Sequence, residues 1–313
     1  YFVPVLTWRL CTYYTNSGVT KTENGSFKLF FDGVLVDEES NQPNSPAIDH
    51  FITIGTRTNS GNIYQDHFSG LIDDTRIYNR ALSDSEIQEL YLENSLSAGL
   101  VAHYPFDGDA ADATGNGNDG VVSGAALTQG LDGNENSAYR FNGSISENIR
   151  VDNFPEIRES LSISAFFKPG AFGYPVLNPI VTRGYSNQEA YTLWVQSMDS
   201  MKLMLNWESP ENTSCEAIIS PALSMDAYNH LAAVYDYTAQ EIRLYANGAQ
   251  MGSCDYAHQI YSQTEPFYIS SSYPGGRDYL VGDLDEIRIY NRALSTSEIQ
   301  EIFGQLFLSE PQA

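Results

Sequence analysis

The chain has 313 residues, enough for two domains of ordinary size, and 42% of them are hydrophobic, so a core can be buried. Its 16 Lys and Arg residues are outnumbered by 40 Asp and Glu residues, which gives a formal net charge of −24 at pH 7. A surface this negative repels the phosphates of nucleic acids and anionic membranes, and the sequence has no stretch long and apolar enough to span a bilayer. We therefore expect a secreted or cell-surface protein that neither binds nucleic acid nor inserts into a membrane.

Residues 1–93 contain strand and turn signals followed by a helix signal. The segment 27–31 ends at Asp32-Gly33, a dipeptide typical of a type I′ hairpin turn because both central residues need positive φ. Cys11 falls on a segment that we interpret as a core strand, where it would be a small buried hydrophobic residue. The chain begins at Tyr1 rather than at Met, which we interpret as an internal cut.

A short helix is predicted after Leu82. Ser83 is a suitable N-cap, and Glu86 three residues later completes a capping box. Leu82 and Ile87 flank this box and can form a hydrophobic staple. A helix of this length is not stable alone, so it must pack against a sheet through its apolar residues.

From residue 99 onward the pattern is one of many short strands separated by turn signals. Apolar and polar residues alternate in the segments 161–167, 191–196, 202–207, 231–236 and 241–246. Asn247-Gly248 is a second type I′ turn signal. This spacing predicts an all-β protein built as a two-sheet antiparallel β-sandwich.

An internal repeat organises the chain. Residues 70–91 and 282–303 are identical at 15 of 22 positions at a constant offset of 212. The match continues upstream between residues 27–33 and 242–248, at an offset of 215. The second copy therefore also ends in a capped helix, with Ser295 as the N-cap.

The two copies differ in length, which predicts one complete and one partial module. The start of the first copy, around Trp8, matches only the region near Tyr228. The expected boundaries are the C-terminal part of a first module at 1–93, a linker at 94–98, a complete module at 99–306 and a tail at 307–313. The partial module would expose strands, so it would need a neighbour: the missing upstream part of the same polypeptide, the second module or another chain.

The repeated motif Gly-x-(Ile/Leu)-Asp-(Asp/Glu)-x-Arg-Ile-Tyr-Asn-Arg-Ala-Leu-Ser-x-x-Glu-Ile resembles the closing signature of laminin-G-like (LamG/pentraxin-type) domains of the concanavalin A-like lectin/glucanase superfamily. Segments 100–107, 112–120, 139–143 and 229–232 are similar to earlier motifs of that family. Tyr228 stands where the family usually has Trp. The resemblance implies a concanavalin A-like jelly-roll sandwich, with a short capped helix closing each repeat.

The loop 107–119 is a candidate calcium site. It concentrates carboxylates, amides and glycines, and calcium takes six to eight oxygen ligands that include backbone carbonyls. The family resemblance implies one structural calcium shared between this loop and the closing strand. In this sequence the implied ligands are Asp112, Asn116, Asn118 and Asp285.

Strand alternation supports a buried position for Asp285. It is expected on the same face as Ile287 and Ile289, where a carboxylate needs a cation or good hydrogen bonds. The alternative is that Asp285 pairs with Arg292 or with backbone amides, and that the loop is simply rich in turns.

A candidate carbohydrate site comes from the same alternation. If the Leu-rich faces are core, Trp194, Gln196 and Asn206 project outward from a sheet. An aromatic plane flanked by amides suits a sugar, whose C–H faces pack on rings while its hydroxyls need donors and acceptors. The alternative is that Trp194 is covered by a loop and belongs to the core.

The remaining candidates concern cysteine pairing and catalysis. A disulfide between Cys215 and Cys254 fits a secreted module. The superfamily's Glu-x-Asp-x-x-Glu motif is absent from residues 283–288, and His230 is expected to be structural. We expect a non-catalytic binding module for carbohydrate within a larger protein. The alternatives are a protein-binding adhesion or spacer module with a structural calcium and, less favoured, a glycan-active enzyme.

Overall fold

The computed structural model describes residues 5–11, 15–21, 27–31, 34–39, 54, 57–58, 64–65, 71–78, 80–170, 177–185, 188–206, 211–262, 264–271 and 279–308. The chain forms two compact units, Tyr1–Ala98 and Gly99–Ala313. We refer to them as the first and second units. Cys11 lies in a described strand of the first unit, but its side chain lies outside the described residues.

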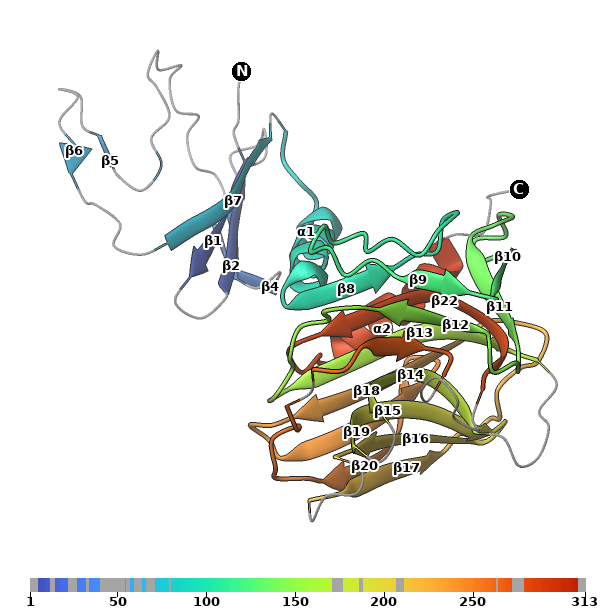
Figure 1. Ribbon diagram of the computed structural model, residues 1–313. Helices are drawn as coiled ribbons and strands as arrows, with labels where there is room; N and C mark the ends of the chain where they lie inside the picture. The colour runs from blue at the N-terminus through green and yellow to red at the C-terminus, as the bar shows by residue number, and fades with distance from the viewer. Residues whose placement is uncertain are drawn as a thin grey trace. The chain divides into compact units, whose positions relative to one another are not determined.

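The first unit contains one principal sheet and one helix (Figure 1). The sheet is antiparallel, with the strand order β4-β3-β2-β1-β7, and two further strands pair as a short ribbon. The elements are β1 (Val5–Cys11), β2 (Thr15–Lys21), β3 (Phe27–Phe31), β4 (Val34–Glu39), β5 (Arg57–Thr58), β6 (Tyr64–Gln65), β7 (Leu71–Tyr78) and α1 (Asp84–Ser97).

Helix α1 covers one face of this sheet. Phe30 of β3 is buried with Leu82 and Ile87, and Tyr78 packs against the same cluster. The other face is open among the described residues, since Leu29 is 41% exposed and Ile77 is 40% exposed. The staple residues predicted for the helix therefore form the small core of this unit.

The predicted capping box is present at the start of α1. The Glu86 backbone N–H donates to Ser83 Oγ at 3.1 Å, and the Ser83 backbone N–H donates to Glu86 Oε2 at 2.7 Å. Arg80 adds an ion pair to Glu86 at 2.6 Å. The helix continues through Ser97, so most of the expected linker 94–98 is helical, and the chain turns only at Ala98-Gly99.

The second unit is a sandwich of two antiparallel sheets (Figure 1), which confirms the predicted fold class. One sheet has the order β10-β11-β22-β13-β18-β19-β20, with β8 also paired to β22, and the other has the order β17-β16-β15-β14-β21-β12-β9. The elements are β8 (Leu100–Tyr104), β9 (Val121–Ser123), β10 (Ala126–Thr128), β11 (Ala138–Asn142), β12 (Asn148–Val151), β13 (Leu161–Pro169), β14 (Asn178–Tyr185), β15 (Gln188–Ser197), β16 (Ser200–Leu205), β17 (Thr213–Ile218), β18 (Asn229–Asp236), β19 (Glu241–Ala246), β20 (Ala249–Asp255), β21 (Phe267–Ile269), β22 (Val281–Tyr290) and α2 (Thr296–Leu308).

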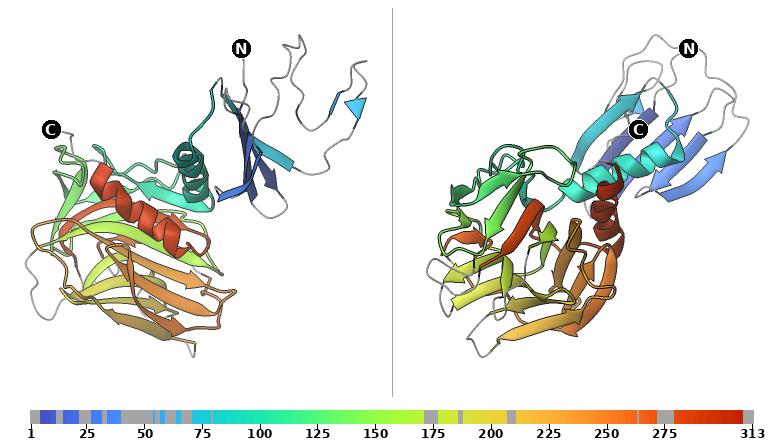
Figure 2. Two further views of the ribbon diagram at one scale, coloured as in Figure 1. Left: turned by 180° about the vertical axis from the view of Figure 1, so that it is seen from behind. Right: turned by 90° about the vertical axis from the view of Figure 1, so that its right-hand side faces the viewer.

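The facing surfaces of the two sheets enclose a single apolar core. Alternate residues supply it from both layers, such as Ile163 from β13 and Leu193 from β15. Helix α2 packs on the outer face of the eight-stranded sheet (Figure 2), where the ring of Phe303 lies 6.1 Å from that of His230. Its capping box repeats that of α1, with the Glu298 backbone N–H donating to Ser295 Oγ at 3.3 Å. The helix continues to Leu308, into the expected tail at 307–313.

Candidate functional site

An acidic pocket lies where two strands share one edge of β22. Strand β11 pairs with β22 from Val281 to Leu284, and β8 pairs with it from Ile287 to Tyr290. Asp285 and Glu286 fall in the gap between them. A cavity of about 180 Å³ opens there, and besides these two residues it is lined by Pro105, Asp107, Leu131, Asp132 and Ser137.

A β-bulge places both carboxylates at this gap. On the other edge of β22, β13 pairs Phe166 with Asp285 but Ser164 with Arg288, so the register shifts, and Glu286 has a φ of 51°. The core positions Leu284 and Ile287 are therefore three residues apart instead of two. The expectation that Asp285 shares a face with Ile287 and Ile289 is wrong, because the bulge interrupts the alternation.

Asp285 is deeply buried and has acidic neighbours. The residue is only 3% exposed. Its carboxylate accepts hydrogen bonds from the backbone N–H groups of Leu131 and Glu286, both at 2.7 Å. Burial, with the charges of Glu286 and Asp132, raises the pKa of Asp285 to about 8. Burial and the same two acidic groups also raise the pKa of Asp107. The pocket thus holds carboxyl groups whose negative charge, when they ionise, is not balanced by neighbouring positive charge or hydrogen bonds.

Glu286 differs from Asp285 because His103 and the guanidinium group of Arg288 lie beside it. Its Oε2 lies 2.7 Å from His103 Nε2 and 2.7 Å from Arg288 Nη2. Burial opposes ionisation of Glu286, but the His103 hydrogen bond and the Arg288 charge outweigh it and lower its pKa. Of the two bulge carboxylates, Asp285 is the one that needs a counter-charge.

The loop that was expected to hold calcium is organised by hydrogen bonds instead. Asp112 Oδ1 accepts from the His103 backbone N–H at 3.1 Å and from both the N–H and the hydroxyl of Thr114, the latter at 2.7 Å. Asp112 Oδ2 accepts from the backbone and side-chain amides of Asn118, both at 3.2 Å. Asn116 and Asn118 also donate to the Val101 carbonyl.

These bonds occupy most of the lone pairs of the Asp112 carboxylate, and none of them involves Asp285. The grouping of Asp112, Asn116, Asn118 and Asp285 around one ion stays a prediction. Among the described residues, no three His, Cys, Asp or Glu side chains converge on a point where a metal could bind. The pocket around Asp285 gathers four acidic residues, Asp107, Asp132, Asp285 and Glu286, around one cavity.

The candidate carbohydrate residues are not arranged as expected. Trp194 is only 8% exposed and Asn206 is fully buried, whereas Gln196 is partly exposed. Asn206 donates to Tyr256 Oη at 2.6 Å and to the Gln259 carbonyl at 2.8 Å, and its Oδ1 accepts from the Tyr261 N–H. The prediction that Trp194 and Asn206 face solvent is wrong, because Trp194 is almost fully covered and Asn206, whose φ is 54°, hydrogen-bonds to Tyr256 of the sandwich core.

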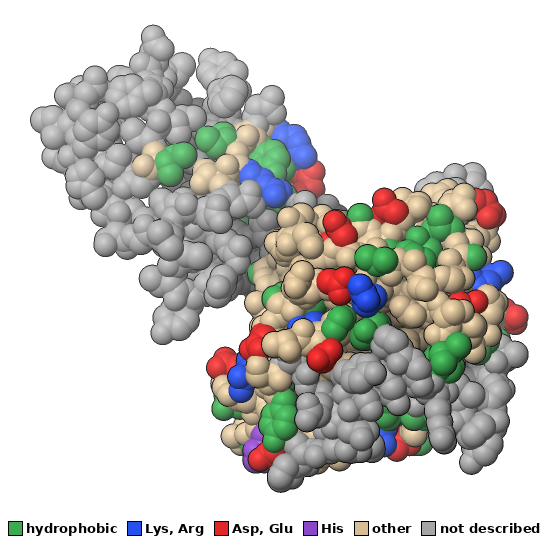
Figure 3. Space-filling view, in the orientation of Figure 1, with side chains coloured by type: hydrophobic (Ala, Val, Ile, Leu, Met, Phe, Trp, Pro, Cys, Tyr) green, Lys and Arg blue, Asp and Glu red, His purple; other side chains and the backbone are tan. Residues whose placement is uncertain are grey.

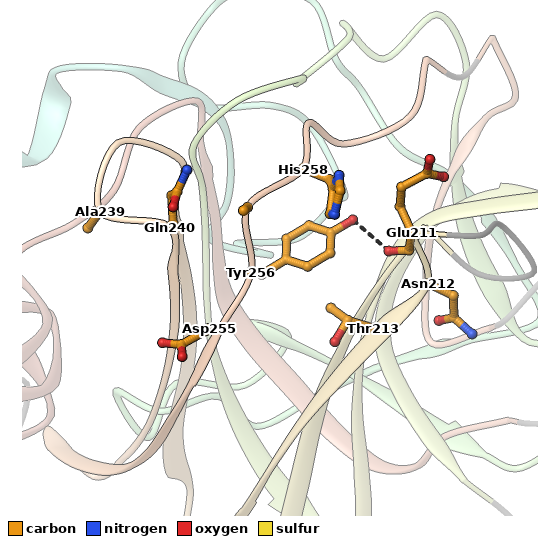
Figure 4. A pocket seen from close by; sticks show the side chains of 9 residues that line it. Glu211, Asn212, Thr213, Ala239, Gln240, Asp255, Tyr256 and His258 are labelled. Atoms are coloured by element: carbon orange, nitrogen blue, oxygen red, sulfur yellow. Dashed lines mark hydrogen bonds between the residues drawn. The ribbon is translucent and has the colours of Figure 1, made fainter.

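A larger polar pocket lies at one end of the sandwich, and we call it the edge pocket (Figure 4). Its volume is about 500 Å³. Three segments line it: the start of β17, the turn between β18 and β19, and the chain after β20. The lining residues are Glu211, Asn212, Thr213, Ala239, Gln240, Asp255, Tyr256, Ala257 and His258.

Tyr256 forms the fixed base of the edge pocket. It is 5% exposed, and its hydroxyl donates to the Glu211 carbonyl at 3.0 Å while accepting from Asn206. Its ring packs edge-on against Tyr235 at 5.3 Å and against His258 at 5.6 Å. Burial raises the pKa of Tyr256 to about 12, so the phenol remains protonated at neutral pH. Asn206 thus contributes to the pocket indirectly, by orienting Tyr256.

A disulfide fastens two walls of the edge pocket. Cys215 of β17 is bonded to Cys254 of β20, with Cα atoms 5.7 Å apart, within the range that disulfides require. Thr213 precedes one cysteine by two residues and Asp255 directly follows the other. Strands β17 and β20 are edge strands of the two different sheets, so the bond joins the layers beside the pocket.

The edge pocket was missed at the sequence level because its residues come from three separate segments. One signal was present: the run Asp255-Tyr256-Ala257-His258 places two polar side chains and an aromatic one directly after a half-cystine. Polar and aromatic residues that follow a covalently fixed strand end are good candidates for a binding surface.

The two-sheet sandwich and its closing helix define a lectin-type β-sandwich protein. The chain belongs to the family described as the concanavalin A-like lectin/glucanases superfamily, whose Laminin_G_3 model matches residues 7–88 and 142–300. The two matched segments correspond to the partial and complete copies of the repeat. No curated protein matches the chain.

Solved structures with this fold include three binding domains. The binding domain of Paraclostridial Mosquitocidal Protein 1 has a TM-score of 0.56 and 18% identity, over 68% of this chain and 53% of that one. Domain 4 of AbnA, a GH43 extracellular arabinanase from Geobacillus stearothermophilus solved with arabinotriose, has a TM-score of 0.53 and 22% identity, over 65% and 97%. The botulinum neurotoxin serotype D ligand-binding domain, solved with N-acetylneuraminic acid, has a TM-score of 0.55 and 13% identity, over 68% and 52%.

These identities show a shared fold. The chain spans about half the length of the mosquitocidal and neurotoxin domains and nearly all of the arabinanase domain. In the part of the chain that the structure describes, no helix is long and apolar enough to cross a membrane.

Proposed function

We propose that the second unit is a non-catalytic carbohydrate-binding module of a secreted or cell-surface protein, and that the edge pocket is its binding site. The observation that carries the proposal is the pocket itself: amide, hydroxyl, imidazole and carboxylate groups gathered around one cavity, with the buried Tyr256 fixed beneath them. Saccharides suit this lining, because their many hydroxyls need hydrogen-bond donors and acceptors.

Rigidity of the walls favours binding at this place. Tyr256 is held by two hydrogen bonds and two ring contacts, and the disulfide fixes the strands on either side. A preformed site loses little entropy when a ligand binds. The carbohydrates bound to the arabinanase domain and to the neurotoxin domain are compatible with the same use of the fold.

An extracellular location is supported by the disulfide, since such bonds persist in oxidising compartments. A non-catalytic role is supported by the absence of the glucanase motif from residues 283–288, where the bulge uses Glu286 in ion pairs with His103 and Arg288. The second candidate is a protein-binding or spacer module. On the face shown in Figure 3, acidic side chains are spread singly over the second unit and form no single patch for a basic partner.

A glycan array probed with the full chain tests the proposal. We expect binding to a defined class of saccharides, and loss of that binding in Ala239→Trp, which fills the edge pocket without removing a polar group. The matched control is Asp226→Trp, at an exposed position in the loop that follows the other end of β17. A chain that binds no saccharide contradicts the proposed function, and equal binding by both variants contradicts the proposed site.

We also propose that a structural calcium binds at the pocket around Asp285, with Asp107 and Asp132 as the nearest further carboxylates. Support comes from the buried carboxyl group of Asp285, whose ionised form has no cationic partner among the described residues. An ion bound only by the folded state stabilises it by about 2.7 kcal/mol at a hundred times its dissociation constant.

Thermal unfolding of the chain with calcium and with a chelator tests this site. We expect calcium to raise the melting temperature of wild type, Asp285→Asn to remove that response, and Asp112→Asn to retain it. Melting that is indifferent to both calcium and chelator would show that Asp285 is satisfied by backbone amides alone.

A further inference from the structure

The segment that follows β20 forms no helix or strand, but its backbone is held tightly, and we call residues 256–261 the pinned loop. The disulfide at Cys254 fixes the strand from which it starts. Six hydrogen bonds of 2.7–3.0 Å then join its backbone to the rest of the second unit. They run from the Tyr256 N–H to the Gln240 carbonyl, from Tyr235 Oη to the His258 carbonyl, from Asn206 Nδ2 to the Gln259 carbonyl, from the Ile260 N–H to the Arg158 carbonyl, from Arg158 Nε to the Ile260 carbonyl and from the Tyr261 N–H to Asn206 Oδ1.

The side chains of the pinned loop divide into buried anchors and exposed groups. Tyr256 and Ile260 are buried, whereas the other four residues are exposed. One of the exposed residues, His258, lines the edge pocket. A backbone that is ordered before a ligand arrives loses little entropy on binding, so the side chains that it presents to solvent are well placed for recognition.

Tyr261 presents an open aromatic surface at the end of this loop. It is 39% exposed, and among the described side chains it is the only Tyr, Phe or Trp with this degree of exposure. Its hydroxyl donates to the carboxylate of Glu211, and its backbone N–H donates to Asn206 at 2.8 Å. The residue is thus held at both ends, and the ring surface is the part of the side chain left to a ligand.

Tyr261 adjoins the edge pocket through partners that it shares with Tyr256. Glu211 accepts from Tyr256 Oη with its backbone carbonyl, the bond drawn in Figure 4, and from Tyr261 Oη with its carboxylate. Asn206 is likewise bonded to both tyrosines. Glu211 lines the pocket, whereas Tyr261 does not. The exposed ring therefore stands just outside the pocket, beside one of its walls.

We propose that Tyr261 is the stacking platform of a second subsite beside the edge pocket, so that the second unit binds a chain of at least two pyranose units. The proposal rests on the carbohydrate-binding function given above and deepens it. The edge pocket supplies polar groups for one sugar unit, but its own tyrosine, Tyr256, is buried. Tyr261 supplies the open aromatic face on which the C–H groups of the next pyranose ring pack.

The test follows the affinity of the full chain as a saccharide is lengthened. The probes are β-1,4-linked oligomers of glucose, xylose and N-acetylglucosamine, from one to four units, titrated by calorimetry with the monosaccharides measured by competition. In the series that binds, we expect affinity to rise about tenfold from one unit to two, which corresponds to about 1.4 kcal/mol. Further units should add little, because the two subsites are then filled.

Substitutions at Tyr261 locate the second subsite. Tyr261→Ala should remove the rise and leave the affinity for the monosaccharide unchanged, which also shows that the edge pocket is intact. Tyr261→Phe keeps the ring and should keep the rise, although it loses the hydroxyl bond to Glu211. The matched control is Met225→Ala, which removes an exposed apolar side chain beyond the other end of β17 and should change neither quantity.

The outcomes separate this inference from the proposed function. A flat series, or array binding confined to glycans other than these pyranose chains, would overturn the second subsite and leave a carbohydrate-binding module. A rise that survives Tyr261→Ala, or that Tyr261→Phe also removes, would overturn the role of the ring. No binding of any probe, together with a blank glycan array, would overturn both proposals.

Discussion

The two units contain the same sheet in the same register, but among the described residues only the sheet of the second unit is covered on both faces. The order β7-β1-β2-β3-β4 of the first unit corresponds by position to β22-β13-β18-β19-β20 of the second. Leu29 pairs with Val19 in one unit as Leu244 pairs with Ala233 in the other. The bulge also recurs, because the register of β1 on β7 shifts between Thr7 and Arg9 as that of β13 on β22 shifts between Ser164 and Phe166.

The difference lies in what fills the space beneath the sheet. In the second unit, β14 to β17 come between β13 and β18 and supply four strands of the second layer. In the first unit, β1 and β2 are only three residues apart in sequence. The sequence match had related the start of the first copy to the region of Tyr228, next to β18, whereas β1 occupies the position of β13 in the sheet.

The comparison shows which part of the fold is local in sequence. The helix-side positions Phe30 and Tyr245 are buried in both units, since the helix that covers them follows a few residues after the closing strand. The opposite positions Leu29 and Ile77 are about 40% exposed, whereas their counterparts Leu244 and Ile289 are fully buried. One face is thus completed by the repeat itself, and the other depends on strands from a distant part of the chain.

The largest expected effect concerns the opposite face. Ile289→Ala should destabilise the second unit by about 2–5 kcal/mol, because it removes buried methyl groups and leaves a cavity. Ile77→Ala should cost less than about 1 kcal/mol, because that side chain is half exposed. Urea unfolding followed by hydrogen exchange in each unit measures both. Equal costs would mean that the Ile77 face is covered in solution.

The disulfide should stabilise only the second unit. The first unit has a single cysteine, Cys11, so it cannot contain such a bond. Replacing Cys215 and Cys254 together with Ala should cost the second unit about 2–4 kcal/mol, because the unfolded chain regains the freedom of a long loop. Cys11→Ala is the control for the second unit. Insensitivity of its unfolding to a reductant would argue that the two edge strands are held by packing alone.

A pH response should also distinguish the units. His230 is fully buried beside Ser164 Oγ at 2.9 Å, and burial with the Arg288 charge lowers its pKa from 6.5 to about 3. Below pH 6.5 the unfolded chain takes up a proton that the folded second unit refuses, so stability falls as pH falls. Relative to His230→Gln, wild type should lose about 2 kcal/mol between pH 6.5 and pH 5. Parallel pH profiles would show that His230 is protonated in the folded state.

The smallest effect should be equal in the two units. Ser83→Ala and Ser295→Ala each remove the N-cap of a helix with the same capping box, which typically costs about 1 kcal/mol. Comparing the two substitutions tests whether the contribution of the N-cap depends on whether the sheet of that unit is covered on both faces. A much larger cost in the second unit would mean that docking of α2 on the complete sandwich depends on its cap.

Much of the fold could be predicted because its signals are short-range. The capping boxes, the alternation of strands such as 161–167 and the closing motif each depend on residues within a few positions of one another. The expected linker at 94–98 adjoins the boundary between the two units, but most of it is helical, because α1 continues through Ser97. The sequence pattern of a helix does not show where the sheet that it packs on ends, so the C-terminal end of α1 could not be predicted.

The site was harder to predict because it depends on contacts between distant segments. Alternation predicted that Trp194 and Asn206 face outward, but it could not reveal that Trp194 is covered or that the positive φ of Asn206 departs from strand geometry. It also failed at Asp285, where one bulge residue shifts the register. The loop around Asp112 has the composition of a calcium site, yet Thr114 and Asn118 supply enough donors to satisfy it.

The Cys215–Cys254 bond also determines how the second unit responds to a pulling force. The two cysteines are 39 positions apart in sequence, so the segment between them cannot be extended when the chain is stretched from its ends. At about 3.4 Å per residue, this hides on the order of 130 Å of contour length. The segment between the cysteines contains β18, β19 and most of β20, together with two lining residues of the edge pocket, Ala239 and Gln240. If tension separated the two sheets, the turn between β18 and β19, which is one of the three segments that line the pocket, would stay inside the loop closed by the disulfide.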